Sequence, residues 1–158
     1  MPVLITSGLS PEAWRLQRIL GTNDVVFCDE SQMPGIPGIR SIVLPTYSSG
    51  SYIHETLKAC LDYNIDRVYP LKQGEVLELS KARDLYSEYN IRLVIPSGDW
   101  LKENHSETIS NAANITVVEE YVVKAGSLPP GELIPPDGTG IFCWATGTGK
   151  IQYSLYII

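Results

Sequence analysis

The stretch VLITSGLSPE, residues 3–12, decides the fold of this chain. Its first part, Val3–Ile5, is typical of a buried strand, because strands covered on both faces read as continuous apolar runs. Gly8 ends the run, and Ser10–Glu12 favour a helix start with a capping hydroxyl, a proline in the first turn and a negative charge at the positive end of the helix dipole. Together these features predict the opening of a Rossmann-like βαβ unit, with a ligand position beside the helix N-terminus.

The same alternation of strands and amphipathic helices continues as far as Pro96. Apolar runs predict further strands at 25–28, 41–45, 67–71 and 92–96. Apolar residues at spacings of three and four predict helices at 11–20, from Ser51 onward and from Gly74, the last with an inner face of Val76, Leu79, Ala82, Tyr86 and Tyr89. Right-handed crossovers favour the strand order 3-2-1-4-5. We therefore predict an α/β fold built on a Rossmann-like parallel sheet.

The residues after Pro96 have a different character. A polar helix from Asp99, its cap, to about Asn111 is followed by a predicted strand at 115–123. Two further strands, 141–145 and 151–157, flank a glycine-rich turn and predict a hairpin. The chain is thus expected to comprise a Rossmann-like domain, a helical connector and a β-rich C-terminal appendage, at 1–98, 99–114 and 115–158.

Composition limits the classes of partner. The 158 residues carry 18 acidic and 12 basic side chains, a net charge of −6, which argues against nucleic acid or an anionic membrane as the main partner. No run approaches the ~20 apolar residues that span a bilayer, and a cytoplasmic location is expected. The widely spaced Cys28, Cys60 and Cys143 predict reduced thiols and no metal site.

A ligand is expected where the strand order reverses, between the ends of the first and fourth strands. The predicted binding residues are Ser7, Gly8, Leu9, Ser10, Asp29, Lys72, Gln73 and Glu75. Asp29, at the end of the second strand, is placed to hold ribose hydroxyls or is simply a solvated carboxylate; Lys72 is a cation for the ligand or a surface lysine. A small anionic or polar molecule, with phosphate or carboxylate first, is the predicted guest. No catalytic residue and no metal ligand is predicted, since His54 stands alone in a helix.

Several of these runs resemble the N-terminal lobe of the ATP-grasp ligases, the family of carbamoyl-phosphate synthetase large chains and biotin carboxylases. The runs are 3–8, 26–29, 42–45 and 64–71, the last followed by Gly74–Glu75. The resemblance implies a platform that holds the acceptor substrate through Ser7–Ser10 and Lys72–Glu75. It implies that ATP and Mg²⁺ belong to a separate ATP-grasp domain, for which the residues after Pro96 are too few. No cofactor is therefore expected in this chain, and these residues alone should not complete ligase chemistry.

Two other interpretations stay open. The chain could be a non-enzymatic interaction module that forms a homodimer through its C-terminal strands, because Tyr153, Leu155 and Ile157 alternate with more polar residues and a terminal strand can leave an open edge. The tail could equally fold back on its own sheet. A small complete enzyme acting on a nucleotide or sugar derivative is the least favoured, because no nucleophile or base is indicated.

Overall fold

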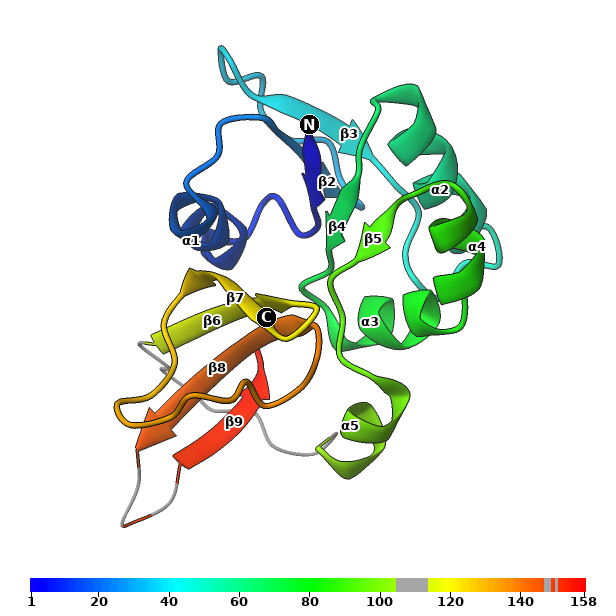
Figure 1. The fold of residues 1–158 in the computed structure, drawn as a ribbon. Helices are drawn as coiled ribbons and strands as arrows, with labels where there is room; N and C mark the ends of the chain where they lie inside the picture. The colour runs from blue at the N-terminus through cyan, green and yellow to red at the C-terminus, as the bar shows by residue number, and fades with distance from the viewer. Residues whose placement is uncertain (105–113, 147–148, 150) are drawn as a thin grey trace. The chain divides into compact units, whose positions relative to one another are not determined.

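The computed structural model describes residues 1–104, 114–146, 149 and 151–158 (Figure 1). The chain divides into two compact units. We call them the parallel unit, Met1–Leu93 with Ile157–Ile158, and the antiparallel unit, Val94–Tyr156. In the described part of the chain, no helix has the length and apolar character needed to cross a membrane.

The parallel unit contains a five-stranded sheet in the order β3-β2-β1-β4-β5, and every pair in it is parallel. This confirms the predicted order and fold class. The strands are β1 (Val3–Ile5), β2 (Val25–Asp29), β3 (Arg40–Val43), β4 (Arg67–Tyr69) and β5 (Arg92–Leu93). Leu4 of β1 lies between Val26 and Val68, and none of the three side chains is exposed. The order reverses between β1 and β4, as the switch-point interpretation requires.

The first helix has the termini that the sequence indicated. In α1 (Pro11–Leu20), the hydroxyl of Ser10 accepts a hydrogen bond from the Ala13 N–H at 3.3 Å. Gly21 ends the helix in the left-handed region, φ 65°, where its N–H bonds the last carbonyls. Both ends of the helix are therefore determined by local sequence.

The helix predicted from Gly74 to Tyr89 is wrong as a single element. The chain forms α3 (Gln73–Ser80) and α4 (Arg83–Glu88), and α2 (Tyr52–Asp62) precedes them. The N–H groups of Lys81 and Ala82 bond to the third residue before them, which tightens the last turn of α3 and ends it. Because the helix is interrupted, the residues after it do not all lie on the inner face that a single helix would have. Tyr86 is buried, whereas Tyr89 is 49% exposed.

The antiparallel unit contains α5 (Gly98–Glu103) and a four-stranded sheet of order β7-β6-β8-β9. The predicted strand 115–123 is wrong, because β6 (Asn114–Glu119) and β7 (Val122–Gly126) form a hairpin. Glu120 and Tyr121 make its turn with φ of 50° and 64°, a conformation that usually requires glycine or asparagine. The sequence therefore carried no turn signal here.

The remaining elements follow the prediction more closely. Strands β8 (Gly140–Thr146) and β9 (Ile151–Leu155) pair antiparallel, as expected for a hairpin, although its turn residues 147, 148 and 150 lie outside the described residues. Ser97, not Asp99, caps α5 by accepting the Trp100 N–H at 3.2 Å. The predicted continuation of this helix, 105–111, also lies outside the described residues.

Candidate functional site

The candidate site lies at the carboxyl ends of β1 and β4, where Thr6 connects the two strands. The N–H of Thr6 donates to the Tyr69 carbonyl at 3.2 Å. Its hydroxyl accepts the Leu71 N–H at 2.8 Å and donates to Glu75 Oε2 at 2.6 Å. Thr6 is fully buried and was not among the predicted site residues, because a threonine at the end of a strand carries no sequence signal of its own.

Glu75 occupies the N-terminus of α3. Its Oε2 accepts the backbone N–H of Lys72 at 3.3 Å in addition to the Thr6 hydroxyl, and the residue is only 6% exposed. Burial raises the pKa of the Glu75 carboxyl, although the Thr6 hydrogen bond and the charge of Lys72 act in the opposite direction. A carboxylate of the protein itself thus lies at a helix end where a bound anion was expected.

The turn between β1 and α1 is held by hydrogen bonds within the protein. The N–H of Gly8 donates to the Cys28 carbonyl at 2.9 Å, that of Leu9 to Asp29 Oδ2 at 3.1 Å and that of Ser10 to the Ser7 carbonyl at 2.8 Å. Since each of these three amides already has an acceptor, an incoming anion would have to displace one of them. The other Asp29 oxygen accepts the Glu30 N–H at 2.8 Å. Asp29 therefore fixes the turn, and its contact with a ribose stays a prediction.

Ser7 differs from its neighbours because its side chain is unsatisfied. Its backbone has φ 56°, which is uncommon for a residue other than glycine. Its carbonyl accepts both the N–H and the hydroxyl of Ser10, each at 2.8 Å, which holds this conformation. Its own Oγ is buried and has no hydrogen-bond partner among the described residues. Strain and an unsatisfied polar atom thus coincide at one predicted site residue.

Lys72 is paired within the protein. Its Nζ lies 3.0 Å from Glu30 Oε1, and both side chains are partly exposed. Asp29, Glu30 and Glu75 thus supply three carboxylates, and Lys72 supplies one ammonium group. Gln73 is exposed on the first turn of α3, so it lies at the same end of β4 as Lys72 and Glu75. The structure therefore brings the predicted residues to the carboxyl ends of these strands, in acidic surroundings.

Two glycines of the site are required by packing. A Cβ at Gly8 would lie 2.5 Å from Met33 Sδ and 2.8 Å from Phe27 Cβ. A Cβ at Gly74 would overlap the ring of Tyr47. The loops that follow β2 and β3 thus fill the space above both glycines with the protein's own side chains, which sequence reasoning missed because Met33 and Tyr47 lie in irregular segments.

The described ranges hold no group of three or more His, Cys, Asp or Glu side chains that could bind a metal ion. The three cysteines are buried, and none of them forms a disulfide. Burial, with a smaller contribution from Glu75, raises the pKa of Cys28 well above its ordinary value, so this thiol stays protonated and is a poor nucleophile. The groups that the named residues offer at the site are therefore hydroxyls, carboxylates, the Gln73 carboxamide and the Lys72 ammonium group, which suit binding better than covalent chemistry.

No protein-family model matches the chain, and no curated protein is significantly similar to it in sequence. The geometry of the site is therefore the basis for the functional proposal.

Proposed function

We propose that the parallel unit is a binding lobe for a small polar ligand at the carboxyl ends of β1 and β4. The observation that carries the proposal is Ser7, whose buried hydroxyl lacks a partner in the described structure and is held in place by a left-handed backbone. A buried polar atom without a partner is costly, and a bound polar molecule would provide the missing hydrogen bond. Ser7 is only 2% exposed, so a ligand reaches its hydroxyl only after neighbouring side chains move, and Met33, which lies against the adjacent Gly8, is unbranched and adaptable.

The charges favour a neutral or cationic ligand over an anion. Glu75 and Asp29 already accept the N–H groups that an anion would use, and Lys72 is paired with Glu30. A ligand with N–H or O–H donors would instead be attracted by the carboxylates and could donate to Ser7. The anionic ligand that the sequence predicted is therefore less favoured than a neutral or cationic one.

The resemblance to ATP-grasp ligases extends this proposal to a reaction context. In those enzymes the corresponding lobe holds the acceptor substrate, while a separate domain binds ATP and Mg²⁺. We infer the same division of labour here: this lobe holds a polar acceptor, and the nucleotide and metal belong to a partner domain. The buried hydroxyl beside a helix N-terminus supports the binding role.

The proposal is tested by following backbone amide and indole N–H signals by NMR during titration. Millimolar methylammonium and acetamide are expected to shift the signals of Gly8, Gln73 and the Trp14 indole, whose Nε1 donates to the Gly8 carbonyl at 2.9 Å. Phosphate, acetate and ATP are expected to leave them in place. Shifts with none of these compounds would contradict a ligand-binding role.

Two substitutions sharpen the test. Ser7→Ala should weaken binding by about 0.5–1.5 kcal/mol, one neutral hydrogen bond, whereas Ser87→Ala on the exposed face of α4 should not. Lys72→Met should leave binding unchanged or tighten it if the ligand is neutral or cationic. A loss of about 1.5–3 kcal/mol in phosphate binding by Lys72→Met would instead identify the anionic class.

A second candidate function is self-association through the antiparallel unit. Strand β9 is at the edge of its sheet, and an edge strand presents unpaired backbone groups to another chain. Its side chains alternate in burial: Ser154 and Tyr156 are buried, whereas Tyr153 and Leu155 are partly exposed. The edge position of β9 and the partly exposed Tyr153 and Leu155 side chains both support a homodimer as the alternative role.

A further inference from the structure

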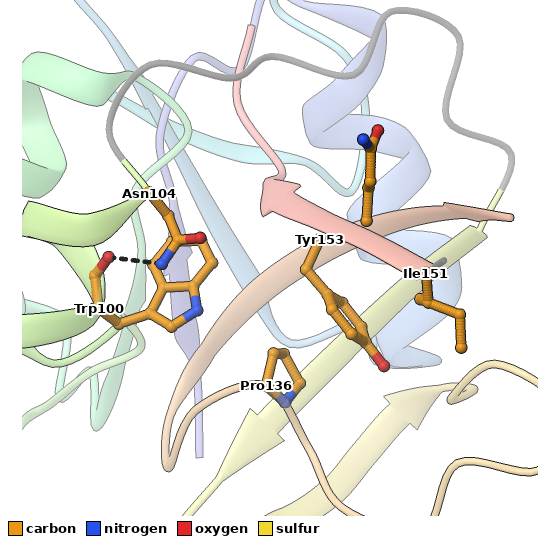
Figure 2. Close-up of a pocket in the computed structure, with 6 residues that line it drawn as sticks. Trp100, Asn104, Pro136, Ile151 and Tyr153 are labelled. Atoms are coloured by element: carbon orange, nitrogen blue, oxygen red, sulfur yellow. Dashed lines mark hydrogen bonds between the residues drawn. The ribbon is translucent and has the colours of Figure 1, made fainter. Parts of the chain in front are cut away.

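The antiparallel unit contains a cavity of about 370 Å³ to which no function has been assigned above (Figure 2). Its size is that of a site for a small organic molecule. Six of the described residues line it, from α5 and the residue after it, the loop before β8 and strand β9: Trp100, Asn104, Pro136, Ile151, Gln152 and Tyr153. All six belong to one unit, so the cavity can be described independently of the switch-point site.

The walls of this cavity are preformed. Figure 2 shows Trp100 and Asn104 on one side, Tyr153 on the other and Pro136 between them. Trp100 is only 8% exposed, and its ring meets the Phe142 ring edge-on with the two ring centroids 5.0 Å apart. The start of α5 is tied to the residue after Pro136, because the N–H and the hydroxyl of Ser97 donate to the Asp137 carboxylate at 2.7 and 2.9 Å. A ligand would therefore lose little free energy in ordering these walls.

The polar groups that the described residues contribute to the cavity are neutral. Asn104 Nδ2 donates to the Trp100 carbonyl at 2.9 Å, which fixes the plane of the carboxamide that also carries Oδ1. Gln152 is exposed, and the Tyr153 hydroxyl is buried without a partner in the described ranges. None of the six lining side chains is ionisable near neutral pH. Burial and, to a smaller extent, the charge of Glu132 raise the pKa of Tyr153, so its hydroxyl stays protonated at neutral pH.

We propose that this cavity binds one ring of a neutral sugar. Carboxamides and a phenol each offer both a donor and an acceptor, which matches hydroxyl groups that also do both. The Tyr153 ring, Pro136 and Ile151 offer apolar surface for the C–H face of the sugar. Trp100 is too covered to provide the open stacking surface that a planar base or a proline-rich peptide requires. None of the described residues that line the cavity is charged, which disfavours phosphorylated ligands.

The three tryptophans of the chain make the test specific. Trp100 lines the cavity, whereas the indole N–H of Trp14 donates to the Gly8 carbonyl and that of Trp144 to the Ser127 carbonyl, each at 2.9 Å. Titration with millimolar glucose, galactose, mannose and N-acetylglucosamine should shift the Trp100 indole signal in a saturable way for at least one sugar. The Trp14 signal reports the switch-point site, so failure of either site is seen separately.

Variants decide which groups bind. Tyr153→Phe keeps the ring and removes only the unpartnered hydroxyl, so the protein should remain folded while sugar affinity falls about twofold to tenfold. Gln152→Ala should have a similar effect on affinity, and Lys124→Ala on β7, the opposite edge strand of the sheet, should have none. The proposal is overturned if no sugar shifts Trp100, if shifts persist unchanged in both cavity variants, or if adenosine or a proline-rich peptide binds instead.

Discussion

The two units differ in how far the polar groups of their candidate sites are already paired within the protein. At the carboxyl end of the parallel sheet, most charged and polar groups satisfy one another, with the Ser7 hydroxyl as the exception: Thr6 pairs with Glu75, the Leu9 N–H with Asp29, and Lys72 with Glu30. In the antiparallel unit, the described side chains that line a cavity are neutral. A topological switch point therefore predicts where a site lies. It does not predict which polar groups remain available to a ligand, because that depends on how many of them already have partners within the protein.

The largest expected losses of stability come from replacing one glycine in each unit by alanine. A Cβ at Gly126, which has φ 74°, would overlap the Ile115 carbonyl oxygen, a backbone atom that cannot rotate away. Gly126→Ala should therefore destabilise the protein by about 3 kcal/mol or more. Gly8→Ala meets the fixed Phe27 Cβ and the flexible Met33, and should cost about 1–3 kcal/mol. Urea unfolding followed by circular dichroism measures both.

Each of these variants has a matched control in its own unit. A Cβ at Gly98, in the antiparallel unit, or at Gly50, in the parallel unit, would meet no atom within 4 Å, and neither glycine has a positive φ. Alanine at these positions should leave the free energy of unfolding unchanged or raise it by about 0.4–1 kcal/mol. Equal losses at Gly8 and Gly50 would show that packing over the switch point is not what requires glycine there.

Adjacent hydroxyls in the parallel unit provide the next comparison. Thr6→Val keeps the shape of the side chain but leaves the Leu71 N–H and the Glu75 carboxyl without the Thr6 hydroxyl, so a loss of about 2 kcal/mol is expected. Ser7→Ala removes a hydroxyl that has no partner within the described structure, and its stability should equal or exceed that of the wild type. Chemical denaturation of the two variants side by side gives the difference. If Ser7→Ala were the more destabilising, the buried hydroxyl would have a structural partner.

A smaller, pH-dependent effect is expected at Glu75. Burial raises its pKa in the folded protein, so the folded state retains a proton that the unfolded chain has lost. The contribution to stability is fully present below the ordinary glutamate pKa of about 4.3 and is lost as the pH rises through the folded value. Glu75→Gln, which keeps an acceptor oxygen but does not titrate, should therefore gain stability relative to wild type as the pH rises through this window. Unfolding free energies of both proteins across the pH range test the sign, and a difference independent of pH would contradict it.

The weakest expected interaction is association through β9. An open strand edge should give a dimer mass in light scattering at micromolar concentration, and Leu155→Lys, which places a charge on this edge strand, should return the protein to a monomer. A monomer mass for the wild type would remove the second candidate function and leave the cavity proposal intact.

The sequence by itself determined the features that depend on neighbouring residues. Ser10 and Gly21 bound the first helix as local capping rules predict, and the apolar runs gave the parallel sheet and its strand order. The residues at the switch point could also be predicted from the sequence, because the strand order determines which strand ends lie side by side. Elements without local signals were missed, such as the turn at Glu120 and Tyr121 and the break after α3.

Only the tertiary structure decided which groups fill the available space. Thr6 and Glu75 are 69 residues apart, and Met33 reaches Gly8 from another loop, so no spacing rule could relate them. The cavity brings Trp100 of α5 together with Tyr153 of β9 in the same way. Periodicity and capping are properties of a few consecutive residues, whereas occupancy of a site is set by packing between distant segments, and that packing determines which ligand chemistry each unit can offer.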